Sequence, residues 1–171
     1  MALTKLNYTG QGTVPIANIP TITGAKMPAG SVIQTVQIRN NGGTVTNANA
    51  TLVDTGISLS ITPSSTSNKI LITANFTGTS TYANSAGGTM YALYRNGTTN
   101  LFSGANDNGM LEYDSNASAY NHSISQLSYL DSPSSTSATT YGIYIKRIGS
   151  GIASLQRDWG GVTMIAMEIA G

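Results

Sequence analysis

The single histidine of the chain, His122, is the first residue whose type suggests catalysis. A histidine next to a serine and a carboxylate is the arrangement of serine hydrolases, in which the imidazole takes the proton of the nucleophile. Twenty serines, however, would place one near any histidine in the fold, and the sequence has no Gly-x-Ser-x-Gly turn. We therefore assign no catalytic residue and expect the chain not to be an enzyme.

Two acidic side chains could form a glycosidase pair. Glu112 and Asp114 lie two residues apart, so they point to the same face of an extended segment. Glycosidases need two carboxylates roughly 5–10 Å apart, but only seven acidic residues exist and no aromatic-rich cleft motif accompanies this pair. We therefore expect both carboxylates to be solvated charges at a strand edge.

Metal and cofactor motifs are incomplete. Residues 106–109 have the composition of a calcium loop, but an EF-hand register would place Gly104 and Ser115 where carboxylates are required. That leaves a weak calcium site as the remaining alternative. Gly10 and Gly12 begin a dinucleotide fingerprint, yet Pro15 occupies the place of its third glycine. Without cysteine there is no thiolate site. We expect no metal and no cofactor.

The charge balance excludes further classes of partner. The chain has 8 Lys plus Arg against 7 Asp plus Glu, for a net charge of +1, and the cations are dispersed along the sequence. Phosphate binding needs clustered cations, so we expect no nucleic acid as partner. No stretch of eighteen apolar residues occurs, which predicts no membrane insertion. Residues 1–5 lack the apolar core of a signal peptide, which favours synthesis and assembly in a cytoplasm.

The elements that would position these residues are strands. Apolar and polar residues alternate with period two, and no segment shows a 3.6-residue period, which predicts half-buried strands with one face on a core. Turn sequences separate the strands: residues 62–68, residues 131–137, residues 40–43, and the hairpin dipeptide Asn96-Gly97. We predict seven or eight strands in an all-β fold, an antiparallel, jelly-roll-like β-sandwich. The alternating segments are 36–38, 57–61, 70–76, 91–93, 127–129, 141–145 and 162–169.

The last predicted strand, residues 162–169, is apolar on both faces. One face carries Ile165, Met167 and Ile169, and the other carries Val162, Met164 and Ala166. A strand of this kind is either central in a sandwich or covered by a neighbouring subunit. We predict a subunit interface at the second set.

Residues 1–30 form a separate region, an extended N-terminal arm that precedes the sandwich domain of residues 31–171. Three of the five prolines lie there, and the residue before a proline avoids the helical region. Glycines interrupt any strand, so the arm is either a disordered terminus or is held by another molecule. Its apolar residues would be the anchors to a partner: Leu3, Leu6, Tyr8, Val14, Ile16, Ile19 and Ile22.

Tyrosines supply the remaining candidate contacts. Together with many Asn, Ser and Thr side chains they can make adaptable polar and stacking contacts, and about half of them should face the core. We therefore keep a host-surface glycan or a protein as a hypothetical partner of this surface. The tyrosines outside the arm are Tyr82, Tyr91, Tyr94, Tyr113, Tyr120, Tyr129, Tyr141 and Tyr144.

Four strings resemble a β-domain of tailed bacteriophages, above all cyanophages and marine phages, that occurs in tail-fibre and other virion structural proteins. They are Met27–Gln37, Asp54–Ile72, Leu93–Gly97 and Met164–Gly171, and the resemblance covers roughly residues 28–171. It implies a jelly-roll-like, trimeric domain on the outside of a virion. Its motifs are structural, so it transfers no active-site residue.

The chain departs from long tail fibres because it has no heptad, collagen-like or β-helical repeat that could build a shaft. We therefore expect a capsid decoration (cement) protein on the virion surface, a homotrimer whose arm binds the major capsid protein or a tail protein. The alternative is a receptor-binding knob of a tail or head fibre. An enzyme such as a polysaccharide depolymerase ranks third.

Overall fold

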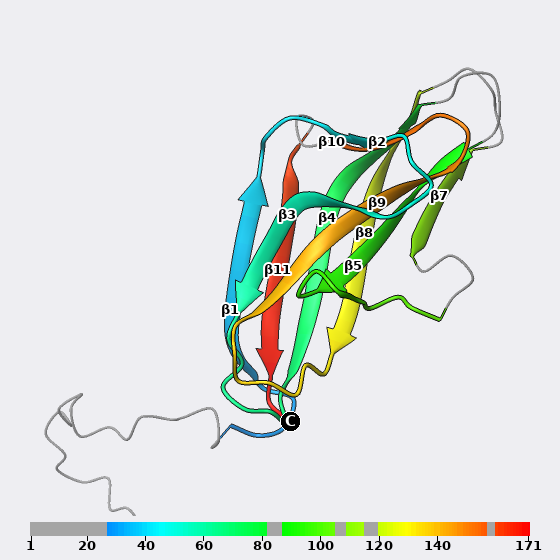
Figure 1. Ribbon diagram of the computed structural model, residues 1–171. Helices are drawn as coiled ribbons and strands as arrows, with labels where there is room; N and C mark the ends of the chain where they lie inside the picture. The colour runs from blue at the N-terminus through cyan, green and yellow to red at the C-terminus, as the bar shows by residue number, and fades with distance from the viewer. Residues whose placement is uncertain (1–26, 82–86, 105–108, 115–119, 157–159) are drawn as a thin grey trace, which may run out of the picture.

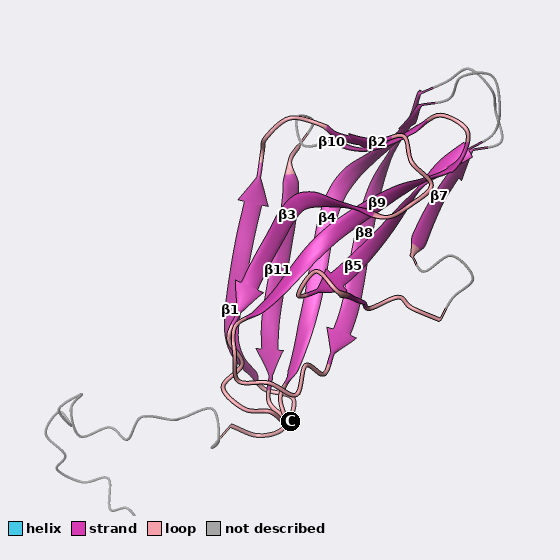
Figure 2. Ribbon diagram, in the orientation of Figure 1, coloured by secondary structure: helices cyan, strands magenta, loops and turns pink. Residues whose placement is uncertain are grey.

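The computed structural model describes residues 27–81, 87–104, 109–114, 120–156 and 160–171. These residues form strands, turns and loops, and no helix (Figure 2). The described part of the chain therefore has no helix long and apolar enough to cross a membrane. The all-β prediction is confirmed. The boundary between arm and domain stays a prediction, because residues 1–26 lie outside the described residues.

In the described residues, eleven strands form two antiparallel sheets that pack face to face (Figure 1). The six-stranded sheet holds β1 (Val32–Asn40), β11 (Val162–Ile169), β4 (Lys69–Thr81), β8 (Tyr120–Asp131), β10 (Ile152–Gln156) and β2 (Val45–Asn47). The five-stranded sheet holds β3 (Val53–Ile61), β9 (Thr139–Gly149), β5 (Gly87–Arg95), β7 (Met110–Asp114) and β6 (Thr99–Asn100). The predicted sandwich is therefore confirmed. The number of strands is larger than the seven or eight that we predicted. The additional strands are the short ones, β2, β6 and β10.

When the three short strands are left aside, eight main strands remain. They pair as they would if one long hairpin were folded over on itself. The first pairs with the last (β1 with β11), the second with the seventh (β3 with β9), the third with the sixth (β4 with β8) and the fourth with the fifth (β5 with β7). Successive pairs fall in alternate sheets. This is the strand order of a jelly roll.

The core lies between the sheets and consists of the inward members of the alternating segments. Ile57, Leu59 and Ile61 of β3 and Ile70, Ile72 and Ala74 of β4 belong to this core from opposite sheets, and all six are at most 3% exposed. Tyr91 and Phe76 meet in the same core with ring centroids 4.8 Å apart. Period-two patterning positions β3 and β11, because one face of each has to leave water. The half-buried pattern expected for residues 91–93 is wrong, since β5 is buried at seven consecutive positions from Gly87 to Leu93.

The predicted hairpin between β5 and β6 is present. Asn96 and Gly97 have φ angles of 52° and 70°, the pair of positive values that a two-residue type I′ turn requires. The Asn96 side-chain oxygen accepts a hydrogen bond from the Thr140 N–H at 2.9 Å, and the backbone N–H of Asn96 donates to the Thr140 carbonyl at 2.7 Å. The turn is thereby fixed to the start of β9.

The N-terminal and C-terminal ends of the described body lie side by side at one end of the sandwich, which we call the foot (Figure 1). The Gly30 N–H donates to the Ala170 carbonyl at 2.8 Å, and the Ala170 N–H donates to the Ser31 carbonyl at 2.9 Å. Gly30 has a φ of +85°, and the Ser31 N–H closes a turn on the Pro28 carbonyl at 3.0 Å. The arm therefore enters the body through a turn at the foot.

Candidate functional site

The sequence-predicted contact residues of the arm fall outside the described part of the chain. Leu3, Leu6, Tyr8, Val14, Ile16, Ile19 and Ile22 belong to residues 1–26, as do Gly10 and Gly12. Their role as anchors remains a prediction.

The predicted subunit interface on β11 is wrong in its choice of face. Val162, Met164 and Ala166 are each 0% exposed and belong to the core of their own protomer, so they are not available to another subunit. Ile165 and Met167 alternate with them and are partly exposed on the outer side of the sheet. Alternation predicts two faces but does not say which one is inside, and here the more exposed face is the opposite one.

The catalytic candidates lie on strands of two different sheets. His122 lies in β8 of the six-stranded sheet, where its backbone pairs with Thr79. Glu112 and Asp114 lie in β7 of the five-stranded sheet, opposite Thr89 and Gly87. Most of the calcium-like loop, residues 105–108, is outside the described chain. Within the described residues, no three His, Asp or Glu side chains gather in a way that could hold a metal ion.

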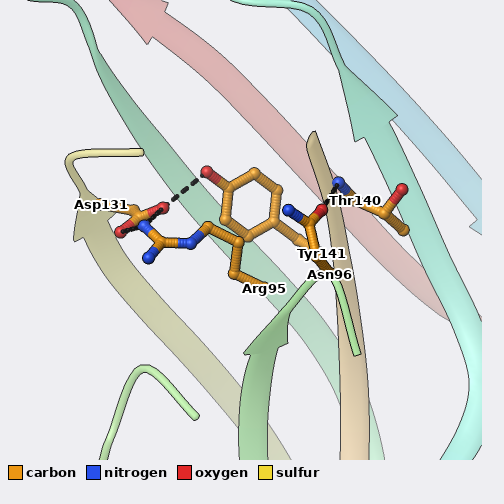
Figure 3. Close-up of polar contacts among 5 residues, drawn as sticks. All are labelled: Arg95, Asn96, Asp131, Thr140 and Tyr141. Atoms are coloured by element: carbon orange, nitrogen blue, oxygen red, sulfur yellow. Dashed lines mark hydrogen bonds and ion pairs between the residues drawn. The ribbon is translucent and has the colours of Figure 1, made fainter. Parts of the chain in front are cut away.

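A polar cluster that the sequence reasoning missed joins the two sheets near the foot (Figure 3). Arg95, the last residue of β5, places Nη1 at 2.8 and 2.9 Å from the two carboxylate oxygens of Asp131, the last residue of β8. The Tyr141 hydroxyl of β9 donates to Asp131 Oδ2 at 2.8 Å. The Arg95 and Asp131 side chains are 25% and 6% exposed, so this ion pair is largely removed from water.

The electrostatics of this cluster make it a structural one. Burial raises the pKa of the Tyr141 hydroxyl far above its ordinary value of 10.0. The hydrogen bond to Asp131 and the negative charge of Asp131 raise this pKa further, and the positive charge of Arg95 offsets only part of the increase. The hydroxyl therefore stays protonated and donates to a carboxylate that the guanidinium already neutralises. Neither group is free to act as a nucleophile or base. The cluster instead links β5, β8 and β9 near the foot of the sandwich.

A second buried carboxylate, Glu168, has no cation partner in the described chain and is 0% exposed. Oε1 accepts hydrogen bonds from the Ser64 N–H at 2.6 Å, the Ser64 hydroxyl at 2.8 Å and the Asn68 amide at 2.6 Å. Oε2 accepts from the Gln34 amide at 2.6 Å. Burial raises the pKa of Glu168, but the hydrogen bonds from Asn68, Gln34 and Ser64 lower it, and the net direction is down. Glu168 is thus held as an anion that fastens β1, β11 and residues 62–68.

The sequence contains a signal for both carboxylates that the prediction did not use. In β11, Glu168 has the same parity as the core residues Met164 and Ala166, and in β8, Asp131 has the same parity as the buried Leu127. A carboxylate on the core side of a strand needs hydrogen bonds or a counter-ion, because an isolated buried charge is costly. Parity would therefore have marked both as structural anchors.

The tyrosines divide between core and surface, as the composition suggested. Tyr91 and Tyr141 are core residues, whereas Tyr94 and Tyr144 stack on each other with ring centroids 4.0 Å apart and are partly exposed. These two lie on the outer face of the five-stranded sheet, because they alternate with the core residues Leu93 and Ile143. They are the described tyrosines that offer ring surface to a partner on that face.

Comparison with solved structures finds remote likenesses. The VP2 subviral particle of infectious bursal disease virus matches with a TM-score of 0.37 and 13% identity, over 81% of this chain and 38% of that chain. The T=1 particles derived from infectious bursal virus match with a TM-score of 0.37 and 10% identity, over 81% of this chain and 36% of that chain. The chain thus spans well under half the length of either match. Likeness at this level does not identify a family.

No family model matches the sequence, and no curated protein is similar to it. The resemblance to a tailed-phage domain therefore stays a prediction from the quoted strings.

Proposed function

We propose that this chain is a non-enzymatic structural protein of a bacteriophage virion surface, a capsid decoration (cement) protein held in place by its N-terminal arm. The observation that carries the proposal is the place where the arm joins the body. Hydrogen bonds of Gly30 and Ser31 with Ala170 put its root at the foot of an elongated sandwich (Figure 1). An arm that leaves from one end suits a body that stands on a shell.

The polar chemistry of the described body supports a role without catalysis. The buried carboxylates, Asp131 and Glu168, have their oxygens occupied by close donors. A general base or nucleophile needs access to a substrate atom. Both carboxylates instead hold strands and loops together.

The mechanism that follows is additive burial. Ordering an extended arm costs about 1–2 kcal/mol per residue in backbone entropy. Binding to a preformed surface can offset this cost through buried apolar side chains, each contributing about 1.5–3 kcal/mol when fully buried. On a symmetric particle this contact repeats many times. The major capsid protein, or a tail protein, is the proposed partner, and the protein would join the particle in the host cytoplasm.

The test uses particles assembled without this protein. A chain with Leu3, Leu6 and Tyr8 all changed to Ser is expected to lose attachment in a co-sedimentation assay. A matched control changes Thr4, Asn7 and Thr9 to Ser instead, which alters the same stretch without removing an apolar anchor. Normal attachment of the first variant would refute the anchoring role of the outer half of the arm.

A receptor-binding knob is the second candidate, and the outward Tyr94–Tyr144 pair favours it. Aromatic rings on a sheet face offer stacking surface to a glycan of the host surface. The two roles differ in copy number, which a stained gel of purified particles measures. Decoration predicts copies in proportion to the major capsid protein and a shell that weakens on removal of the protein. A knob predicts few copies, and added free protein would block infection.

A further inference from the structure

The outer face of the six-stranded sheet carries an apolar patch that the sandwich does not cover. Leu71 of β4 pairs with Met167 of β11 on one side and with Leu130 of β8 on the other, so three apolar side chains form one row across three strands. Ile165 lies two residues from Met167 on the same face, and Ile169 pairs with Val32 of β1. We call this set the outer patch: Val32, Leu71, Leu130, Ile165, Met167 and Ile169.

The outer patch is accessible, and one charged side chain borders it: Lys69, which is exposed and pairs with Ile169. Leu130 is 51% and Val32 49% exposed, and the other four are partly exposed. Glu168, between Met167 and Ile169 in β11, points to the opposite side, into the core. Since the described strands form two layers, neither layer packs over this face. A contiguous apolar patch of this kind marks a site of contact with another chain, unlike single exposed apolar residues.

The root of the arm lies at one end of this patch. Val32 directly follows the turn of residues 28–31, and Ile169 directly precedes Ala170, which holds that turn. The first described residues cross the foot before the chain enters β1 (Figure 1). Gly30 and Ser31, at the root of the arm, therefore lie beside the patch.

We propose that residues 14–26 of one copy of the chain dock on the outer patch of a second copy. From Val32 to Leu130 the patch is four strands wide, about 15 Å, which four or five extended residues would span. Residues 14–26 reach about 40 Å when extended. Residues 14–26 are thus much longer than the width of the outer patch on the same chain. They can therefore reach the outer patch of a neighbouring copy.

The sequence of this segment fits such a surface. Pro15 and Pro20 favour polyproline-type backbone, in which every third residue falls on the same side about 9 Å apart. Ile16, Ile19 and Ile22 have this spacing. About 9 Å is also two strand spacings, the separation of Met167 from Leu130. One isoleucine would contact β11 while the next contacts β8.

Arm exchange of this kind is a head-to-tail contact, which closes into a ring when the rotation between copies allows. It would provide the predicted homotrimer. The inference rests on the proposed role of the arm as an anchor, but it assigns only the inner half to the neighbour. The outer half of the arm, with Leu3, Leu6 and Tyr8, would still bind the particle.

Cysteine cross-linking tests the exchange cleanly, because the chain has no cysteine of its own. Ile19→Cys protein is mixed with Leu130→Cys protein and oxidised. A disulfide between the two different chains is expected, and little with Ser58→Cys as the partner, since Ser58 is exposed on the other sheet. Equal cross-linking to both positions would overturn the proposal. So would a cross-link that forms only when one chain carries both cysteines.

Self-association in the absence of particles provides the second measurement. The double variant Leu130→Thr and Met167→Thr keeps β-forming side chains and is expected to weaken self-association at least about tenfold in sedimentation, as loss of a central apolar contact does. Ile124→Thr is the control, because Ile124 is 91% exposed on the same strand outside the patch. An unchanged oligomer in the double variant, or a wild-type monomer, would overturn the inference.

These readouts separate the two proposals. The outer-half variant of the arm tests attachment to particles, whereas the cross-link and the sedimentation test the contact between copies. If the double variant does not fold, the cross-link decides alone, because Leu130→Cys changes a half-exposed side chain at the end of an outermost strand.

Discussion

The two buried carboxylates of the foot occupy one row of the same sheet and are stabilised in opposite ways. Glu168 of β11 and Asp131 of β8 both pair with Ile70 of β4, one on each side. Asp131 faces a guanidinium and a tyrosine hydroxyl from the five-stranded sheet. Glu168 receives only neutral donors, from β1 and residues 62–68.

The difference shows what each carboxylate holds. The pair of Asp131 and Arg95 joins one sheet to the other, and its loss would leave a charge stranded in the core. The hydrogen bonds of Glu168 join a loop to its own sheet beside the root of the arm, and their donors are individually weaker. We therefore expect the Asp131 cluster to matter more for unfolding of the whole sandwich.

The largest effect is expected from Arg95→Met, which keeps the aliphatic stem but removes the charge. Asp131 then remains buried without its cation, and the free energy of unfolding should fall by about 3 kcal/mol. Urea denaturation measures it. Arg39→Ala is the control: Arg39 is exposed and bonds Asn41 and the Gly160 carbonyl, so a change within about 0.5 kcal/mol is expected. An equal loss of unfolding free energy in Arg95→Met and Arg39→Ala would contradict the stabilising role of the Asp131 cluster.

Glu168→Gln should cost somewhat less. The shape is kept, but hydrogen bonds to a charged acceptor become neutral, and the new amide opposes the amide of Gln34; the expected loss is about 2 kcal/mol. Hydrogen exchange should show the loss concentrated in residues 62–68 and the first residues of β1. A uniform loss over both sheets would contradict the local role of this carboxylate.

The pH dependence separates the wild type from that variant. Because the pKa of Glu168 is lowered by folding, its contribution is complete above the unfolded value of about 4.3 and is lost as the pH falls through the folded value. The difference in unfolding free energy between wild type and Glu168→Gln should therefore be constant from pH 7 to about pH 5 and shrink below about pH 4. A difference that persists undiminished at pH 2 would count against the charged form.

The smallest effect is expected from Tyr141→Phe, which removes one hydrogen bond to Asp131 and leaves the ion pair intact. About 1 kcal/mol should be lost at neutral pH. Since folding raises the pKa of Tyr141, the contribution of its hydroxyl is complete below about pH 10 and is lost as the pH rises further. Thermal unfolding at pH 7 and pH 11 measures both; a larger deficit at pH 11 than at pH 7 would refute the assignment.

Much of the fold could be predicted because the period-two pattern is local. The segments around Ile57, Ile70 and Ile143 all became strands, and the Asn96-Gly97 dipeptide became the expected turn. The site could not be predicted in the same way. Arg95 and Asp131 are 36 residues apart, and Ser64 and Glu168 are 104 apart, so no window along the chain contains both partners.

The sequence by itself determined that this chain forms strands and where most of them lie. Only the tertiary structure decided which face of β11 is inside. Alternation is symmetric, and the core side is set by the opposing sheet, which comes from distant parts of the chain. For that reason Val162, Met164 and Ala166 became core, while Ile165 and Met167 joined the outer patch.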